Sequence, residues 1–143
     1  MQENSNQKLP NDVAHLTSDN STISPTVAIS DSLKDYENKR VVFSFEIYNS
    51  SQCEIAKIDK VEAKKLTREL KKISSTSTKH FRHQNVSGIA CKPVYNSGNY
   101  SVLFTNIPED IELLEVDYSG TGRIFGYIVT NIFNVVAIGR DHR

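Results

Sequence analysis

The 143-residue sequence has no tryptophan, one methionine, two cysteines and no long apolar run. Because no stretch approaches the ~20 apolar residues that a membrane helix needs, we expect no membrane-spanning segment. The opening stretch, "MQENSNQKLPNDVAHL", has neither a basic start nor an apolar segment, so no secretory signal is expected. Together these absences predict a cytoplasmic protein.

The two cysteines, Cys53 and Cys91, do not form a Cys-x-x-Cys pair. In a reducing compartment both would remain thiols, which argues against a disulfide framework. Two interpretations stay open at this point. The thiols are small buried side chains, or one of them is a nucleophile that a base such as His80 or His83 activates.

Polar residues are concentrated at the N-terminus. Residues 1–30 are rich in Asn, Ser, Thr, Gln and Asp and show no sustained periodicity, which predicts a disordered polar tail. Residues 31–143 are expected to form a single α+β domain. The first element that the pattern suggests is a short helix within 30–40, capped by Ser30 or Asp31.

The formal net charge is zero, but the charges are distributed unevenly along the chain. Residues 57–92 hold ten Lys or Arg and three Asp or Glu, a net charge of +7. Residues 1–56 have a net charge of −4, and residues 93–143 have a net charge of −3. A basic middle between acidic flanks is typical of a nucleic-acid-binding surface, and the alternative is the solvated face of a helix.

The first strong patterns are a strand followed by an amphipathic helix. Residues 40–49, "RVVFSFEIYN", are β-branched and aromatic, which predicts a buried strand. Asp59 and Glu62 have capping-box spacing, so a helix is expected over 59–73. Its apolar residues fall near one face, and its lysines lie largely elsewhere. The segment 79–85, "KHFRHQN", is either a short second helix or a loop.

From Gly88 onward the pattern predicts strands joined by short turns. Strands are expected at "GIACKPVY", at 100–107, at 111–118, at 123–129 and at 132–139, with Pro93 at a sheet edge. The fold class is therefore α+β, with one or two N-terminal helices packed on a curved antiparallel sheet of four to five strands. The expected core residues are Phe45, Ile47, Leu66, Leu70, Val102, Phe104, Leu114, Ile124, Ile128, Val136 and Ile138.

The last two predicted strands bring cationic and titratable residues together. Strand alternation puts Arg123, Phe125 and Tyr127 on one face of the sheet. A tight turn at 130–131 would pair Arg123 with a residue near 138, so Arg140 and His142 would lie beside it with the same parity. Arginine binds phosphate oxygens, and histidine transfers protons near neutral pH. The sequence thus predicts a phosphate-processing site.

Other residues are candidates for supporting roles. Lys79, His80, Arg82 and His83 would add contacts to an RNA backbone, and Tyr127 would stack on a base. His80 and His83, with Asp141, have the spacing of zinc ligands, but no further ligand set is apparent, so we expect neither a metal nor a cofactor. An acidic strip favours a solvated strand edge or a partner surface over a cation site; it consists of Glu109, Asp110, Glu112, Glu115 and Asp117.

The order of these elements resembles that of the RelE/ParE-type bacterial toxins of type II toxin–antitoxin pairs. The resemblance covers about residues 40–143 and rests on the strands "YSVLF", "GRIFGYIV" and "NVVAIGRDH". Strands in that family carry a Gly-Arg step followed by apolar residues and a tyrosine, which matches Gly122 to Tyr127. The last family strand runs into Arg, His or Tyr residues, which matches Arg140 and His142.

The resemblance implies a metal-independent endoribonuclease toxin that cleaves mRNA at the ribosome and is inhibited by a cognate antitoxin protein. Arg123 and Arg140 would bind the scissile phosphate, and His142 would be the general acid or base. The ParE branch acts on gyrase instead, and the charged C-terminal residues favour the nuclease branch. Two alternatives remain: a non-catalytic protein-interaction module that uses the acidic strip, and an RNA-binding module that uses the basic segment 57–92.

Overall fold

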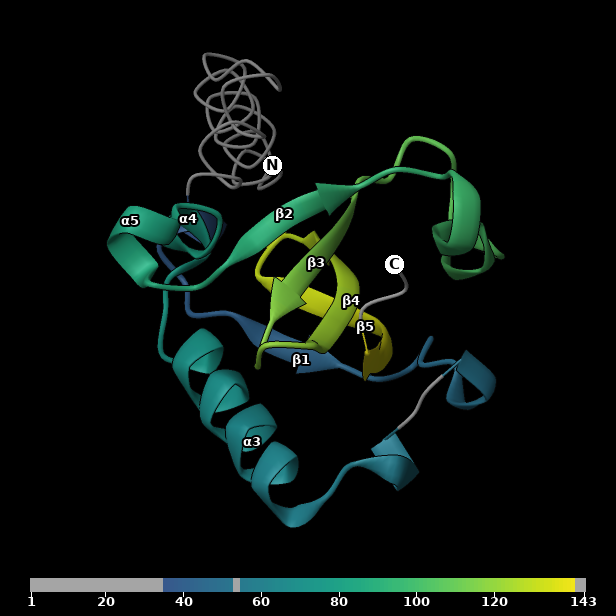
Figure 1. Cartoon of the computed structure of the whole chain (residues 1–143). Coiled ribbons are helices and arrows are strands. Elements are labelled where there is room, and N and C mark those ends of the chain that lie inside the picture. Colours follow the sequence, from purple (N-terminus) through teal and green to yellow (C-terminus); the bar gives the residue numbers. More distant parts are fainter. Residues whose placement is uncertain (1–34, 53–54, 141–143) are drawn as a thin grey trace, which may run out of the picture. The chain divides into compact units, whose positions relative to one another are not determined.

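The structure, a computed structural model, describes residues 35–52 and 55–140. From Tyr36 these residues belong to one compact unit with an α+β fold (Figure 1). The predicted tail and the start of the helix expected within 30–40 lie outside the described residues. The strands are β1 (Val42–Ser44), β2 (Cys91–Val94), β3 (Leu113–Asp117), β4 (Gly122–Val129) and β5 (Ile132–Arg140). The helices that lie wholly within these ranges are α3 (Lys60–Ser74), α4 (Thr78–Phe81) and α5 (Gln84–Ser87), and the 3-10 helices are η2 (Ser50–Gln52), η3 (Ile55–Lys57) and η4 (Gly98–Phe104). Residues 35–37, the described part of the helix expected within 30–40, are also helical.

Helix α3 begins where the capping box predicts it. The side chain of Asp59 accepts a hydrogen bond from the backbone N–H of Glu62 at 2.8 Å. Two lysines lie in the last turn, where cations interact favourably with the unpaired carbonyl groups of a helix. Leu66 and Ile73 are buried against the sheet. The helix expected over 59–73 is therefore confirmed.

The five strands form one mixed sheet in the order β1-β5-β4-β3-β2. Neighbours from β2 to β5 are antiparallel, as their short turns predict, and Pro93 lies in an edge strand as expected. β1 instead runs parallel to β5, so the expectation of an antiparallel sheet is wrong for this pair. The helical segment between β1 and β2 carries the chain from one sheet edge to the other, and the meander then returns to β1.

The segment 100–107, expected as a strand, instead contains η4. The residues that pack on the sheet recur at helical rather than alternating spacing, which accounts for the difference. Val102 falls between them and is 43% exposed, so its expected place in the core is wrong. The residues that do pack on the sheet are Tyr100, Leu103, Phe104 and Ile107.

The strand expected over 40–49 is confirmed only for the three residues of β1. The chain turns directly after it, where the backbone N–H of Tyr48 donates to the carbonyl of Phe45. Phe45 and Ile47 therefore leave the sheet and are 49% and 38% exposed, so their expected core positions are wrong. The apolar run suggests a strand buried on all sides, but β1 lies at the edge of the sheet, where fewer of its residues become buried.

The β4–β5 hairpin contains a β-bulge that turn length alone does not predict. The register pairs Gly126 with Val135 but Phe125 with Ala137, so Val136 is an extra residue on β5. A bulge of this kind bends its strand and shifts every pair beyond it by one residue. The residues of β4 beyond the bulge, from Gly122 to Phe125, therefore each pair with a residue one position later on β5 than the turn length predicts.

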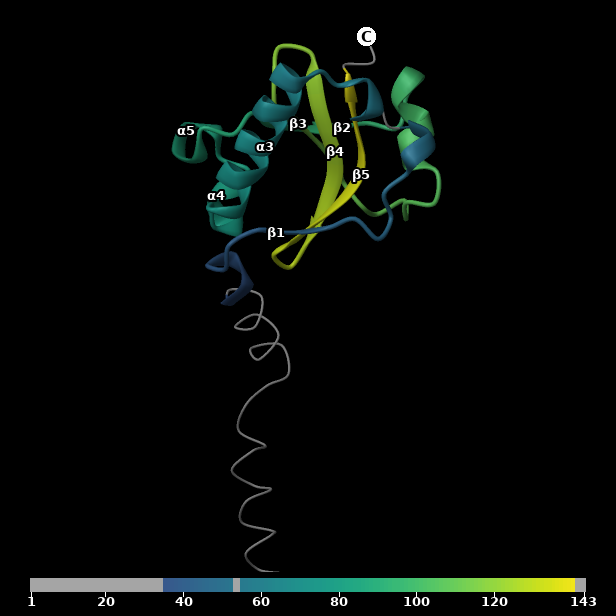
Figure 2. The same cartoon turned by 90° about the horizontal axis from the view of Figure 1, so that it is seen from below.

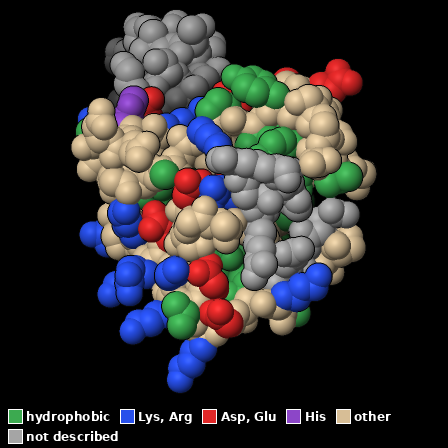
Figure 3. Space-filling model, in the orientation of Figure 1, with side chains coloured by type: hydrophobic (Ala, Val, Ile, Leu, Met, Phe, Trp, Pro, Cys, Tyr) green, Lys and Arg blue, Asp and Glu red, His purple; other side chains and the backbone are tan. Residues whose placement is uncertain are grey.

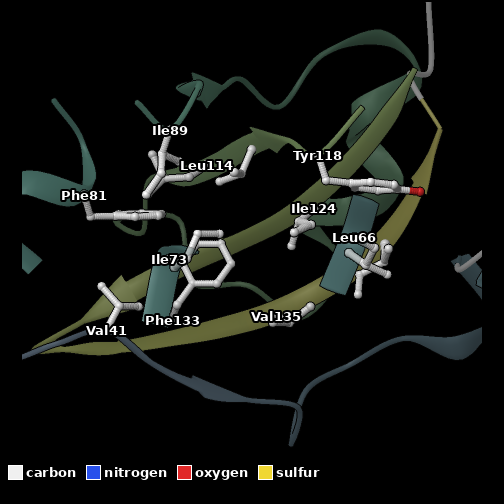
Figure 4. Packing of buried hydrophobic residues seen from close by; sticks show 12 residues of the cluster. Val41, Leu66, Ile73, Phe81, Ile89, Leu114, Tyr118, Ile124, Phe133 and Val135 are labelled. Atoms are coloured by element: carbon white, nitrogen blue, oxygen red, sulfur yellow. The ribbon is translucent and has the colours of Figure 1, made fainter. Parts of the chain in front are cut away.

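The sheet separates two apolar clusters. Helices α3 to α5 cover one face, and η4 lies on the other (Figure 2). On the helical face the ring of Phe133 packs edge-on against Phe81 at a centroid distance of 5.5 Å (Figure 4). It also packs edge-on against Phe43 at 6.0 Å. Of the other expected core residues, Leu70, Phe104 and Ile128 are partly buried. Those that are fully buried are Leu66, Leu114, Ile124, Val136 and Ile138.

Within the part of the chain that the structure describes, no helix is both long enough and apolar enough to cross a lipid bilayer.

Candidate functional site at the start of strand β4

Arg123 is almost fully buried in the sheet. Its Nε lies 3.1 Å from Oε1 of Glu115 and 3.0 Å from Oδ1 of Asp117. Its Nη1 donates to the carbonyl oxygens of Ser119 at 3.1 Å and Gly122 at 2.9 Å. The guanidinium is thus engaged by two carboxylates and by the β3–β4 loop.

The loop between β3 and β4 is also tied to the first turn of α3. The backbone N–H of Gly122 donates to the hydroxyl of Ser119 at 2.8 Å. That hydroxyl donates to the carboxylate of Glu62, and this bond, together with Lys65, holds the pKa of Glu62 below its usual value. The glycine-rich turn is therefore a fixed structure that Arg123 and α3 hold from two sides.

Glu115 lies at the centre of this network. The acidic strip predicts a solvated edge, but the Glu115 side chain is completely buried in the middle of β3, so the expectation is wrong for this residue. Lys92 of the neighbouring strand places its Nζ 3.0 Å from Oε1. Oε1 therefore faces two cations, Lys92 and Arg123. Oε2 is also buried, and no donor among the described residues meets it.

The backbone brings Arg140 to this end of the sheet but not in the expected register. Arg123 pairs with Gly139, and Arg140 pairs with Gly122. The prediction that Arg140 alternates in phase with Arg123 is wrong, because the bulge at Val136 shifts the pairing by one residue. The adjacency of the two backbones is confirmed, since Arg140 lies directly across from the 119–122 loop. His142 lies outside the described residues.

The residues around α4 that the sequence predicts to contact the RNA backbone are not part of the Arg123 network. Arg82 is bonded to Glu112 at 2.7 Å, with both side chains about half exposed. Nδ1 of His80 lies 3.1 Å from the hydroxyl of Ser77. Lys79 and His83 are exposed to solvent.

Glu112 immediately precedes β3, whereas Asp117, the partner of Arg123, is the last residue of that strand. The Arg82 side chain thus lies toward the opposite end of β3 from the Arg123 network. Asp141, the third possible zinc ligand, is outside the described residues. Among residues that the structure describes, no three His, Cys, Asp or Glu side chains gather into a metal site.

Tyr127 shares a sheet face with Arg123, as strand alternation predicts. Phe125 and Tyr127 pack in the cluster beneath η4, while Ile124 and Ile128 pack in the cluster beneath α3. Tyr127 is only partly exposed, so its ring is partly used by the core. On the same face the ring of Phe125 contacts Tyr100 at a centroid distance of 6.0 Å.

A cavity of about 280 Å³ borders Glu115 on this face, between β2 and η4. Its wall includes a strongly exposed aromatic ring, that of Tyr95, whose exposed fraction is 74%. The sequence gives no signal for this cavity, because 100–107 is expected as a strand and not as the helix that forms one wall. The lining residues are Lys92, Pro93, Val94, Tyr95, Ser97, Tyr100 and Glu115.

Helix α3 presents a cationic stripe to solvent, and Lys and Arg side chains gather over this helix in the space-filling view (Figure 3). The stripe consists of Lys60, Lys64, Arg68 and Lys71. At ~100° per residue these positions span only about 80° of arc, opposite the buried face. None of the four forms an ion pair with another described residue, whereas Lys65 and Lys72 pair with Glu62 and Glu69.

Cys91 is the one cysteine whose side chain the structure describes. Burial raises the pKa of its thiol to about 11. Cys91 is therefore protonated at neutral pH, and a protonated thiol is a poor nucleophile. This favours the interpretation of Cys91 as a small buried side chain, and Cys53 lies outside the described residues.

No protein-family profile matches the chain, and no curated protein sequence matches it. The resemblance to the RelE/ParE-type toxins therefore stays a prediction that rests on the quoted strands.

Proposed function

We propose that the protein is an endoribonuclease toxin that cleaves mRNA at the ribosome without a metal ion and is inhibited by an antitoxin protein. The single observation that supports this most directly is the pairing of Arg140 with Gly122. It places the last described residue of β5 beside a loop that is tied down by Arg123 and by α3. A loop that is held in place and pairs with Arg140 suits a reaction that depends on positioning.

In this proposal the three residues of the predicted site have different roles. Arg140 binds the scissile phosphate, and His142 transfers a proton to or from the ribose 2′-hydroxyl or the leaving 5′-oxygen. Arg123 is a positioning residue, because its donors hold two carboxylates and the carbonyls of the β3–β4 loop, whose Gly122 pairs with Arg140. Replacing Arg123 would therefore lower the cleavage rate by disturbing the loop, and not by removing a direct contact with phosphate.

The test is cleavage of ribosome-bound mRNA in the presence of a chelator that binds transition metals and leaves the Mg²⁺ of the ribosome in place. His142→Ala is expected to lower the cleavage rate by about 10²–10⁴-fold, the usual contribution of a general acid or base. His15→Ala is the matched control, because it removes an imidazole from a segment with no assigned role. Equal cleavage by wild type and His142→Ala, or no cleavage by the wild type with or without ribosomes, would contradict the proposal.

A second candidate function, RNA binding without cleavage, is favoured by the cationic stripe on α3. Four cations on one helix face, none of them paired with a carboxylate of a described residue, suit the phosphates of a nucleic-acid backbone. This function needs neither Arg140 nor His142.

The stripe makes its own prediction about the salt dependence of RNA binding. For single-stranded RNA, Lys64→Gln/Arg68→Gln should reduce the slope of log K against log salt by about 0.7 for each phosphate that the variant no longer neutralises. The double variant Lys39→Gln/Arg40→Gln removes the same charge from a different segment and should leave the slope unchanged. Identical slopes for the two double variants would show that the stripe does not contact RNA.

A further inference from the structure

We propose that the cavity between β2 and η4 binds one unpaired nucleobase of the RNA, with Tyr95 as its stacking surface and Glu115 as its hydrogen-bond acceptor. The inference rests on the proposed function in that it takes RNA to be the substrate. It adds a binding site for a base, on the face of the sheet that also carries Arg123.

The acceptor is the part of the cavity that most needs a ligand. Glu115 lines the cavity, and its side chain is completely buried. Oε1 is bonded to Lys92 and Arg123, while Oε2 meets no donor among the described residues. A buried acceptor without a donor is unfavourable, and an N–H group from a ligand would satisfy it.

Lys92 provides a means of entry. Its Nζ stands 3.0 Å from Oε1 of Glu115, and its side chain is 56% exposed. A long, exposed side chain moves at little cost, so Lys92 uncovers the carboxylate when a ligand enters. An N–H group on the Watson–Crick edge of the base then donates to this carboxylate.

The wall of the cavity provides the stacking surface. Tyr95 is 74% exposed, although a large aromatic side chain is normally more buried than this. Proteins that bind single-stranded RNA stack unpaired bases on exposed aromatic rings of this kind. The 280 Å³ volume is close to the lower limit of about 300 Å³ for small-molecule sites, which suits one base and not a longer segment.

Charge argues against a cationic side chain of a partner protein in this cavity. Lys92 and Arg123 already lie at 3.0 Å and 3.1 Å from the same carboxylate oxygen. These two cations balance the charges of Glu115 and Asp117, so a further ammonium or guanidinium group would add an uncompensated positive charge to the network. A neutral N–H donor has no such penalty.

The test measures binding of the four nucleoside 5′-monophosphates, with ribose 5-phosphate as a probe that lacks the base. Isothermal titration calorimetry measures the affinities, because the chain has six tyrosines and their fluorescence would not report on Tyr95 alone. At least one nucleotide should bind more tightly than ribose 5-phosphate. Tyr95→Ala should weaken that binding by about 5- to 150-fold, the equivalent of one base–aromatic stack. Tyr95→Phe, which keeps the ring, should bind as the wild type does.

The outcomes separate this proposal from the proposed function. Nucleotide binding that depends on Tyr95 supports the base site, even if the protein fails to cleave mRNA. Cleavage of mRNA with no nucleotide binding, or with equal binding by Tyr95→Ala, overturns the base site and leaves the nuclease proposal standing. Equal affinity for ribose 5-phosphate, or binding of an arginine-containing peptide in place of nucleotides, also overturns it.

Discussion

Replacing Arg123 with alanine is expected to lower the free energy of unfolding by about 3 kcal/mol, the lower end of the range for breaking a buried ion pair, because it removes the buried one of two cations that compensate a buried carboxylate. Glu115 is completely buried, and Arg123 is one of the two cations that compensate its charge. The substitution also removes the donors that hold the carbonyls of Ser119 and Gly122. Urea-induced unfolding at neutral pH, followed by circular dichroism, would measure the loss.

Arg82→Ala is the matched control for this prediction. Arg82 also forms an ion pair, with Glu112 at 2.7 Å, but both side chains are about half exposed. Exposed pairs of this kind contribute about 0–1 kcal/mol, so the same substitution should be nearly neutral here. Similar losses for the two variants would mean that the Arg123 network contributes no more than a surface ion pair.

A second variant distinguishes an unpaired charge from lost packing. Arg123→Met/Glu115→Met removes both charges and fills the space with apolar side chains. Because replacing a whole buried ion pair by apolar groups is often neutral, the double variant should recover much of the stability that Arg123→Ala loses. A double variant less stable than Arg123→Ala would show that the pair itself, and not the unpaired carboxylate, dominates.

Local signals in the sequence are sufficient for some elements of the fold and not for others. The spacing of Asp59 and Glu62 predicts the start of α3, because capping depends on residues three apart in the chain. The parallel pairing of β1 with β5 depends on residues 90 positions apart, such as Val42 and Ile132, and no local pattern specifies it. The sequence predicts the turns of the meander but not the pairing of β1 with β5.

In the candidate site, too, local patterns predict some features, and others depend on pairing between distant residues. Alternation correctly places Arg123 on the face with Phe125 and Tyr127, since a strand has a period of two whatever its neighbours. The burial of Glu115 does not follow from its own strand, where acidic residues on both sides suggest a solvated edge. It follows from pairing Asp117 with Arg123, which brings the guanidinium to both carboxylates. A buried charge of this kind is predictable only after the register is known.

The β-bulge that sets the register at the site lies next to Gly126. The variant Gly126→Ala tests whether this bulge requires glycine. A Cβ at Gly126 would lie 2.4 Å from the carbonyl oxygen of Asn134 and 2.8 Å from Cζ of Phe133. The backbone oxygen cannot move away without breaking the bulge, so we expect a loss near the upper end of the ~1–3 kcal/mol typical of overpacking. Thermal and urea unfolding would measure it.

Gly120→Ala is the matched control, because a Cβ at Gly120 meets no atom within 4 Å. It should change the free energy of unfolding by less than ~0.5 kcal/mol, as is usual for surface substitutions. If Gly126→Ala relaxes by expelling the bulge, Arg123 would pair with Ile138 in place of Gly139, and cross-strand nuclear Overhauser effects would show the shift. Arg140 would then share the parity of Arg123, which is the arrangement that the turn length alone predicts. Equal stability of the two alanine variants, with Arg123 still paired with Gly139, would mean that the bulge does not require glycine.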